Sequence, residues 1–237
     1  MAQTTTRSFE FQSFDGTVLR GVWTQPEVPL RAAALILQGS GNVDADGDVS
    51  SPLIGAGYQN APAKLSKQLA DTLSAMGITT LRFEKRGYES DPSKAIAQSI
   101  SVLAQDAECA LREVRRTFPQ LKSYVVGLSE GALLATLVAA KTAPEQLADG
   151  LFLLGLPTRG IDEIFEYQFI NWPLERLQLT LDPDGDGILE ESELESLGTS
   201  QPLPILAVPW SALDPQRTGR ISLDGQFKPA ALQYFEQ

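Results

Sequence analysis

The stretch VVGLSEGALLA, residues 125–135, decides the fold predicted for this chain. A short apolar run leads into the pattern G-x-S-x-G at residues 127–131, and an apolar segment of helical length follows as far as Lys141. Two glycines in such a pattern let a buried strand turn sharply into a helix and leave the serine hydroxyl exposed. Ser129 is therefore a candidate nucleophile. The alternative is a tight turn in which Ser129 only caps the helix.

Strands and helices alternate on both sides of this stretch. Two β-rich runs at 8–13 and 18–24 flank Asp15-Gly16, a dipeptide typical of hairpin turns. Further apolar runs predict strands buried on both faces at residues 33–37, 78–83, 124–128 and 151–156. Leucines at helical spacing predict buried stripes on the intervening helices: Leu65, Leu69, Leu73 and Met76 on the first, and Leu103, Ala107, Leu111 and Val114 on the second. The sequence thus predicts an α/β domain with a doubly wound, mostly parallel sheet.

Charge and hydropathy exclude several classes of partner. The formal net charge is −11 and the sequence pI is about 4.5, so the surface repels phosphate backbones and anionic headgroups. No run approaches the length of a membrane-spanning helix, and the amino terminus has no secretory signal pattern. We expect a cytoplasmic chain with no nucleic-acid or membrane partner. The single cysteine, Cys109, reads as a small core residue.

Several segments together resemble the α/β-hydrolase superfamily, and within it bacterial esterases. They are GSGNVDADGD from residue 39, LRFEKRGYESD from residue 81, the GLSEG turn, and FLLGLPTRG from residue 152. The resemblance implies acyl transfer from a small ester-like substrate through Ser129, with the backbone amides of Ser40 and Glu130 as oxyanion donors. The chain departs from the family at Glu84, where an aspartate is usual, and at Leu128, where a histidine is common.

A serine hydroxyl needs a neighbouring base, nearly always histidine held by a carboxylate, and this chain has no histidine. Three explanations are open: an amino-terminal part of a longer hydrolase, which we favour, an inactive relative that binds a ligand, or a serine activated by another group. The first would leave the edge of strand 151–156 without a partner, so we expect self-association there. Residues 204–208 are a candidate seventh strand, and the segment after it makes Asp214 a candidate acid.

The strand–helix rhythm ends near Pro157, which predicts a core of residues 1–157 and a cap or insertion region of residues 158–237. In that region DPDGDGILEESE, residues 182–193, matches the EF-hand pattern D-x-D-x-D-G-x5-E at every fixed position. A solvated acidic loop is the weaker account, because its carboxylates would repel one another without a cation. The expected Ca²⁺ ligands are Asp182, Asp184, Asp186, the Ile188 carbonyl, Glu190 through water, and Glu193.

EF-hands generally occur in pairs, and residues 214–225 keep part of the same pattern. Asp214 lies 32 residues after Asp182, but Gln216, Thr218 and Gly225 replace acidic ligands. We therefore expect a small helical EF-hand-like region whose second loop is a structural mate with weak or no calcium binding, and we prefer this role for Asp214. The acidic residues of segment 44–48 lack the required glycine and glutamate, so that segment is assigned to the oxyanion loop.

Overall fold

The computed structural model describes residues 4–49, 64–88, 96, 98–141, 148–182, 184–190, 193 and 214–229. The chain divides into two compact units, and it passes from the first to the second at Pro157 and Thr158. We call the part up to Pro157 the core unit and the part from Thr158 the second unit. Within the part described, no helix combines the length and apolar character needed to cross a membrane.

A six-stranded sheet forms the centre of the core unit, in the order β1-β2-β4-β3-β5-β6. The outer hairpin is antiparallel, and β3, β4, β5 and β6 are parallel to one another. This confirms the predicted mostly parallel sheet. The strands are β1 (Thr4–Gln12), β2 (Val18–Pro26), β3 (Ala32–Leu37), β4 (Ile78–Phe83), β5 (Lys122–Leu128) and β6 (Gly150–Leu154).

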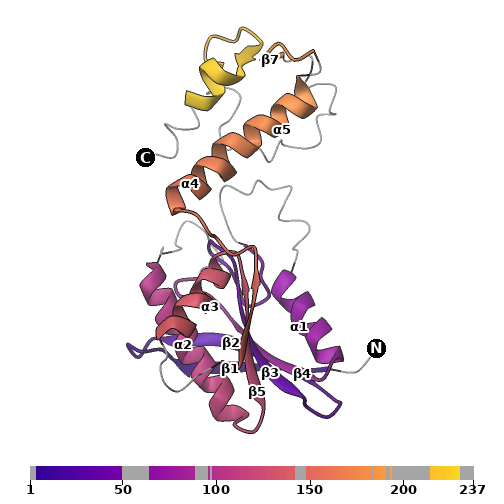
Figure 1. The fold of residues 1–237 in the computed structure, drawn as a ribbon, viewed down its shortest axis with the longest axis vertical. Coiled ribbons are helices and arrows are strands. Elements are labelled where there is room, and N and C mark those ends of the chain that lie inside the picture. Colours follow the sequence, from indigo (N-terminus) through magenta and orange to yellow (C-terminus); the bar gives the residue numbers. More distant parts are fainter. Residues whose placement is uncertain are drawn as a thin grey trace. The chain divides into compact units, whose positions relative to one another are not determined.

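Helices cover both faces of this sheet, as Figure 1 shows. Helix α1 (Leu65–Ala75) packs on one face, and α2 (Ile100–Thr117) and α3 (Glu130–Lys141) pack on the other. Alternate residues of β3 point to opposite faces of the sheet. Leu35 belongs to the cluster under α2 and α3, whereas Ile36 belongs to the cluster under α1. This arrangement explains why the strand reads as a continuous apolar run.

The stripe predicted for α1 is confirmed only in part, since Leu69 and Leu73 pack against the cluster beneath the helix. Leu65 and Met76 are exposed, and the buried residues are the small ones, Ser66, Ala70 and Ser74. The helix lies close to the acidic segment of the β3–α1 connection: a side chain at Gly47 would approach the Ser66 backbone to 2.8 Å. Close packing of this kind selects small side chains at the interface, which a search for leucines at helical spacing misses.

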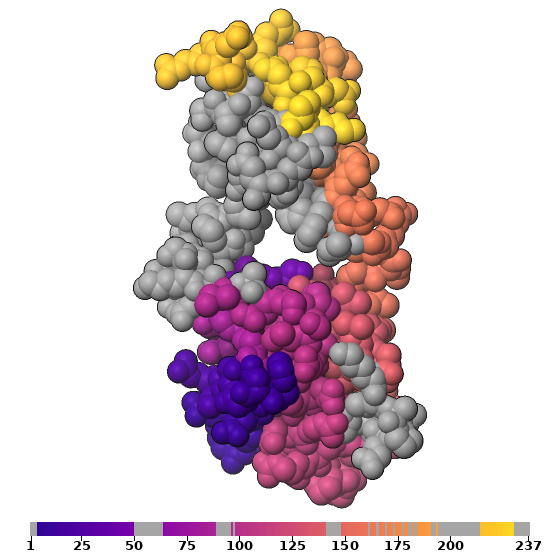
Figure 2. All heavy atoms as spheres, turned by 90° about the vertical axis from the view of Figure 1, so that its left-hand side faces the viewer, coloured from indigo at the N-terminus to yellow at the C-terminus, as the bar shows by residue number. Residues whose placement is uncertain are grey.

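Strand β6 was predicted as a buried strand, and the structure corrects this. It lies at the edge of the sheet, and Phe152, Leu153 and Leu154 are all exposed. Among the described residues no strand pairs with its outer side. At the opposite edge most side chains of β1 are also exposed, and its indigo atoms form part of the surface in Figure 2.

The second unit consists of a nearly continuous helical segment followed by a short two-stranded sheet. The helical segment comprises α4 (Ile161–Glu166), the π-helix η2 (Tyr167–Asn171) and α5 (Trp172–Leu181). Strands β7 (Ile188–Glu190) and β8 (Arg220–Ser222) then pair in antiparallel fashion, and the π-helix η3 (Leu223–Phe227) follows. The predicted strand at 204–208 lies outside the described residues.

Candidate functional site

Ser129 lies at the sharp turn between β5 and α3. Its side chain is exposed and its backbone has a φ of 53°, a left-handed conformation that few residues other than glycine adopt. The Ser129 N–H donates to the Leu154 carbonyl at 2.8 Å, and the Ala132 N–H donates to the Ser129 carbonyl at 2.9 Å. These bonds hold the strained corner on both sides, so the hydroxyl is presented at the carboxyl edge of the sheet.

Both glycines of the turn are required by close backbone contact. A side chain at Gly127 would lie 2.4 Å from the Gly131 carbonyl oxygen, and one at Gly131 would lie 2.2 Å from the Leu37 carbonyl oxygen. Any Cβ atom at these positions would clash with backbone that cannot move aside. The G-x-S-x-G pattern therefore has a steric explanation in this chain.

The loop after β3 lies beside the nucleophile, as the sequence predicted. A side chain at Gly39 would contact the Ser129 Cβ and the Leu128 carbonyl oxygen, each at 3.6 Å. Buried Gln38 fixes the start of the loop, because its Nε2 donates to the Phe83 carbonyl at 2.7 Å and to the Asp44 carbonyl at 3.1 Å. Ser40 follows and is exposed. The roles of the Ser40 and Glu130 amides as oxyanion donors stay predictions.

The acidic segment that continues this loop is held by hydrogen bonds and ion pairs within the protein. Asp44 Oδ1 accepts hydrogen bonds from the backbone N–H groups of Asp46, Gly47 and Asp48, each at 2.9 Å. Asp46 pairs with the buried guanidinium of Arg82 at 2.9 Å and, at 3.6 Å, with Lys64. Its charge is therefore neutralised by the protein. This supports the assignment of residues 44–48 to the oxyanion loop.

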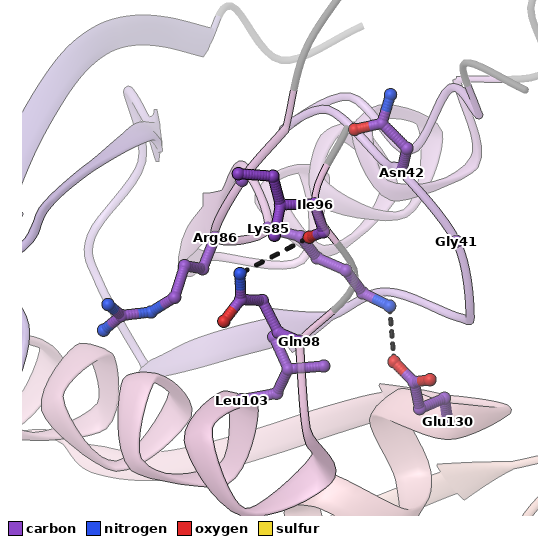
Figure 3. Close-up of a pocket in the computed structure, with 9 residues that line it drawn as sticks. Gly41, Asn42, Lys85, Arg86, Ile96, Gln98, Leu103 and Glu130 are labelled. Atoms are coloured by element: carbon purple, nitrogen blue, oxygen red, sulfur yellow. Dashed lines mark hydrogen bonds and ion pairs between the residues drawn. The ribbon is translucent and has the colours of Figure 1, made fainter. Parts of the chain in front are cut away.

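Lys85 is a residue of this region that the sequence analysis did not single out. Its Nζ forms an ion pair with Glu130 Oε1, and the two side chains are only 10% and 19% exposed. Figure 3 shows the Lys85 side chain pointing toward Glu130 across one side of a cavity of about 280 Å³. Gly41 and Asn42 of the oxyanion loop line the same cavity. The signal that could have found Lys85 is its place two residues after β4, at the edge of the sheet where β5 ends just before Ser129.

The neighbouring Arg86 anchors the β4–α2 connection. Its guanidinium donates to the fully buried Asp106 at 2.6 and 2.8 Å and to Asp15 at 2.7 and 3.1 Å. The hydrogen bonds from Arg86 hold the pKa of Asp15 well below its usual range. Glu84 behaves in the opposite way, because burial raises the pKa of its carboxyl. The loop that holds Lys85 is thus tied to both the first hairpin and α2.

In the second unit, three carboxylates of the predicted calcium loop converge. One oxygen from each of Asp182, Asp184 and Asp186 lies within 4.8 Å of the others. The Asp182 carboxylate also accepts from the Asp186 N–H at 3.0 Å and from the Gly187 N–H at 2.9 Å, which closes the turn. At the end of the loop Glu193 Oε2 accepts from the Glu190 N–H at 2.8 Å. Pro183 and residues 191–192 lie outside the described residues.

The second loop repeats the hydrogen bonds of the first. Asp214 Oδ1 accepts from the Thr218 N–H at 2.9 Å and Oδ2 accepts from the Gly219 N–H at 2.7 Å, as Asp182 does in its own loop. The Thr218 N–H bond is the main reason that the pKa of Asp214 is lowered. The Thr218 hydroxyl donates to the same carboxylate at 3.0 Å. These internal donors favour the role of Asp214 as anchor of the mate loop over that of a triad acid.

Comparison with known protein families identifies the class to which this chain belongs. A model of the Hydrolase_4 family, described as serine aminopeptidase, S33, matches residues 57–182, which is more than half of the chain. The chain therefore belongs to this α/β-hydrolase family, and the predicted superfamily is confirmed. The EF-hand pair stays a prediction.

Individual relatives point the same way. Esterase EstD of Thermotoga maritima is 28% identical over 138 residues, which cover 57% of this chain and 29% of the esterase. The structure of esterase Est22 superimposes with a TM-score of 0.50 at 13% identity, covering 65% of this chain and 44% of that one. The chain thus matches less than half of the length of each relative, and the second comparison concerns the fold alone.

Proposed function

We propose that the core unit is the nucleophile-bearing part of a serine hydrolase that transfers acyl groups from small ester-like substrates to water. The observation that carries this proposal is Ser129, exposed at a left-handed strand-to-helix corner with the Gly39 backbone beside it. A helix-capping serine would not need such a strained conformation. The relation to an esterase supports the choice of ester substrates.

The reaction would follow the usual two steps of acyl transfer. Ser129 Oγ attacks the ester carbonyl carbon while its proton passes to a base, and the alcohol then leaves with a proton from that base. Water hydrolyses the acyl-serine in the second step. The amides of Ser40 and Glu130 would hold the oxyanion; Glu130 is the first residue of α3, so its N–H has no partner within the helix.

The general base is the open part of this proposal, because the chain contains no histidine. An added imidazole can take the place of a missing histidine side chain if the remaining site is intact. We therefore expect a fluorophosphonate probe to modify Ser129 at a rate that rises with imidazole concentration. The site of modification is read by mass spectrometry of the digested protein.

Two controls make this experiment decisive. In the first control, the variant Ser129→Ala should show no imidazole-dependent labelling. In the second, Ser40, an exposed serine of the neighbouring loop, should stay unlabelled in the original chain. Labelling that is spread over surface serines, or that never exceeds the Ser129→Ala background, would count against the hydrolase proposal. The chain would then be better described by its non-catalytic alternative, a calcium-binding protein on a hydrolase-like scaffold.

We also propose that residues 182–193 bind one Ca²⁺ ion, and the pairing of β7 with β8 favours this second function. Leu189 lies opposite Ile221 in that pairing, at the equivalent point of the two loops, as partner EF-hand loops require. The donor set also fits the ion. Carboxylate oxygens within 4.8 Å of one another can share a cation whose bonds to oxygen are about 2.3–2.6 Å long.

Asp182, Asp184, Asp186 and Glu193 would hold the ion together with the Ile188 carbonyl, and Glu190 would act through water. The ion would neutralise the charge of a crowded acidic loop and so stabilise the second unit. Isothermal titration calorimetry with Ca²⁺ tests the proposal. We expect one site per chain that is lost in Asp186→Asn, whereas the matched variant Asp224→Asn, outside the ligand set, should keep it. Absence of binding to the original chain would contradict it.

A further inference from the structure

Lys85 connects the two segments that would supply the oxyanion donors. Its backbone N–H donates to the Val43 carbonyl at 3.1 Å, in the loop that follows β3. Its side chain reaches the other way, to the carboxylate of Glu130, the residue directly after Ser129. One residue at the end of β4 is thus bonded both to the oxyanion loop and to the start of α3.

Burial makes this ion pair costly to disrupt. Both side chains are largely buried, so removing either partner would leave the other charge desolvated and unpaired. The other cations and carboxylates nearby are already engaged: Arg86 pairs with Asp15 and Asp106, and Asp46 pairs with Arg82 and Lys64. Within the described residues, the Lys85 and Glu130 side chains each form an ion pair with the other alone. Their geometry is therefore determined by each other.

We propose that Lys85 is a positioning residue for the oxyanion hole: it fixes the start of α3 against the oxyanion loop, so that the amides of Glu130 and Ser40 face the same point. This inference rests on the proposed hydrolase function of Ser129 but concerns a different residue. Preorganised donors stabilise an oxyanion only when they are held in place before the reaction, and a displacement of about 1 Å removes most of the benefit. Lys85 acts through Glu130 and does not touch the reacting atoms.

Amide hydrogen exchange tests the positioning role without requiring activity. The amides to follow are those of Ser129 and Ala132 on the helix side and of Asp44 and Lys85 on the loop side, all of which are hydrogen-bonded in the structure. In Lys85→Met we expect exchange of both groups of amides to accelerate roughly tenfold, because the local opening that exposes them becomes easier. The separate variant Lys85→Arg keeps the positive charge, and its amides should exchange at the rates of the original chain.

The matched control is Lys122→Met, which makes the same substitution at an exposed position at the start of β5, the far end of the strand that leads to Ser129. It should leave both groups of amides unchanged. The double variant Lys85→Met/Glu130→Leu separates positioning from the cost of an unpaired charge. We expect it to recover thermal stability relative to Lys85→Met while exchange on the loop and helix sides stays fast.

The rate of imidazole-dependent labelling of Ser129 provides the second readout, and it should fall on the order of tenfold in Lys85→Met. Unchanged exchange in both segments, or an increase spread evenly over the whole sheet, would overturn the positioning role. Absence of imidazole-dependent labelling in the original chain would refute the hydrolase proposal and with it the oxyanion role, whereas segment-specific exchange in Lys85→Met would still show that Lys85 joins the loop to α3.

Discussion

Leu189 and Ile221 face each other across the antiparallel pair β7–β8, and both side chains are almost fully buried. Each occupies the eighth position of its loop, and Glu190, which follows Leu189, forms a cross-strand ion pair with Arg220, which precedes Ile221. The two loops therefore share one small core, although only the first has a full set of acidic ligands. Through this shared core we expect ordering of one loop to favour ordering of the other.

The equivalence of the loops predicts that the second can be converted into a binding site. The change is Gln216→Asp, Thr218→Asp and Gly225→Glu, which places carboxylates where the first loop has them. We expect the calorimetric stoichiometry to rise from one Ca²⁺ to two per chain. The control is the same triple change with asparagine and glutamine, which adds similar volume without charge. A stoichiometry of one in the acidic variant would mean that the loops are not equivalent.

Arg220 should weaken calcium binding in the original chain. Its guanidinium lies 2.9 Å from the Glu190 carboxylate, which is the loop residue expected to reach the ion through water. In Arg220→Gln we expect affinity for Ca²⁺ to increase roughly two- to fivefold, because a nearby positive charge is removed and Glu190 is released.

Arg217→Gln is the matched control for this effect. It removes the same charge from the same loop, but no ion pair with Glu190 is recorded for it among the described residues. The Arg217 variant should therefore gain less affinity than the Arg220 variant. Equal gains would show that only the overall field of the loop matters, and a loss in Arg220→Gln would contradict the prediction outright.

Glu84 provides a prediction of pH dependence. Burial is the largest cause of its raised pKa, the charge of Asp44 adds to it, and Arg20 opposes it. A carboxyl whose pKa is raised in the folded state stabilises the fold below its ordinary pKa and loses this contribution as pH rises through the raised value. Glu84→Gln should thus raise the melting temperature at about pH 7, and this gain should shrink toward about pH 4.

Thermal unfolding at both pH values measures this difference directly. Glu10→Gln on the exposed hairpin serves as the comparison, because its exposed carboxylate pairs with an exposed Arg20 at 3.8 Å. If the benefit of Glu84→Gln were the same at both pH values, burial of this carboxylate would not be the cause.

The edge of β6 predicts self-association of the chain. We propose that Phe152, Leu153 and Leu154 allow two copies to meet at this edge, where apolar side chains are exposed and no strand of the described residues pairs with the outer side of β6. Phe152→Lys should shift the monomer–dimer equilibrium toward monomer in analytical ultracentrifugation, because a lysine at a sheet edge disfavours pairing. The equivalent change on the opposite edge, Ser8→Lys, should have little effect. Monomers of the original chain at all concentrations would refute this.

Most of the core fold could be predicted from the sequence because its central strands β3 and β4 are buried on both faces and bounded by glycines or turns. The order of elements and the Ser129 corner follow from the continuous apolar runs and from two glycines whose replacement would cause clashes. The exposure of the β6 side chains could not be predicted from their apolar composition. An apolar strand at a sheet edge has the same composition as one at the centre, since burial depends on neighbours far away in the sequence.

The sequence motifs predicted the main residues of the candidate site, but not the contacts that support them. Ser129, the loop at Gln38 and the acidic residues of the calcium loop follow local patterns. The pair of Lys85 with Glu130 joins residues 45 positions apart, and no local pattern records which two charges meet. The small buried face of α1 was missed for a related reason, because Gly47 and Ser66 approach each other only in the folded chain.

The buried guanidinium of Arg82 gives the oxyanion loop a permanent, built-in cation, which sets this acidic segment apart from the one at Asp182. If the second unit binds Ca²⁺ as proposed, EDTA should lower its stability, whereas the segment at Asp46, whose charge is balanced by Arg82 and Lys64, should be unaffected. The chemistry around Ser129 would consequently tolerate changes in the metal content of its surroundings, even if the fold of the second unit depended on them.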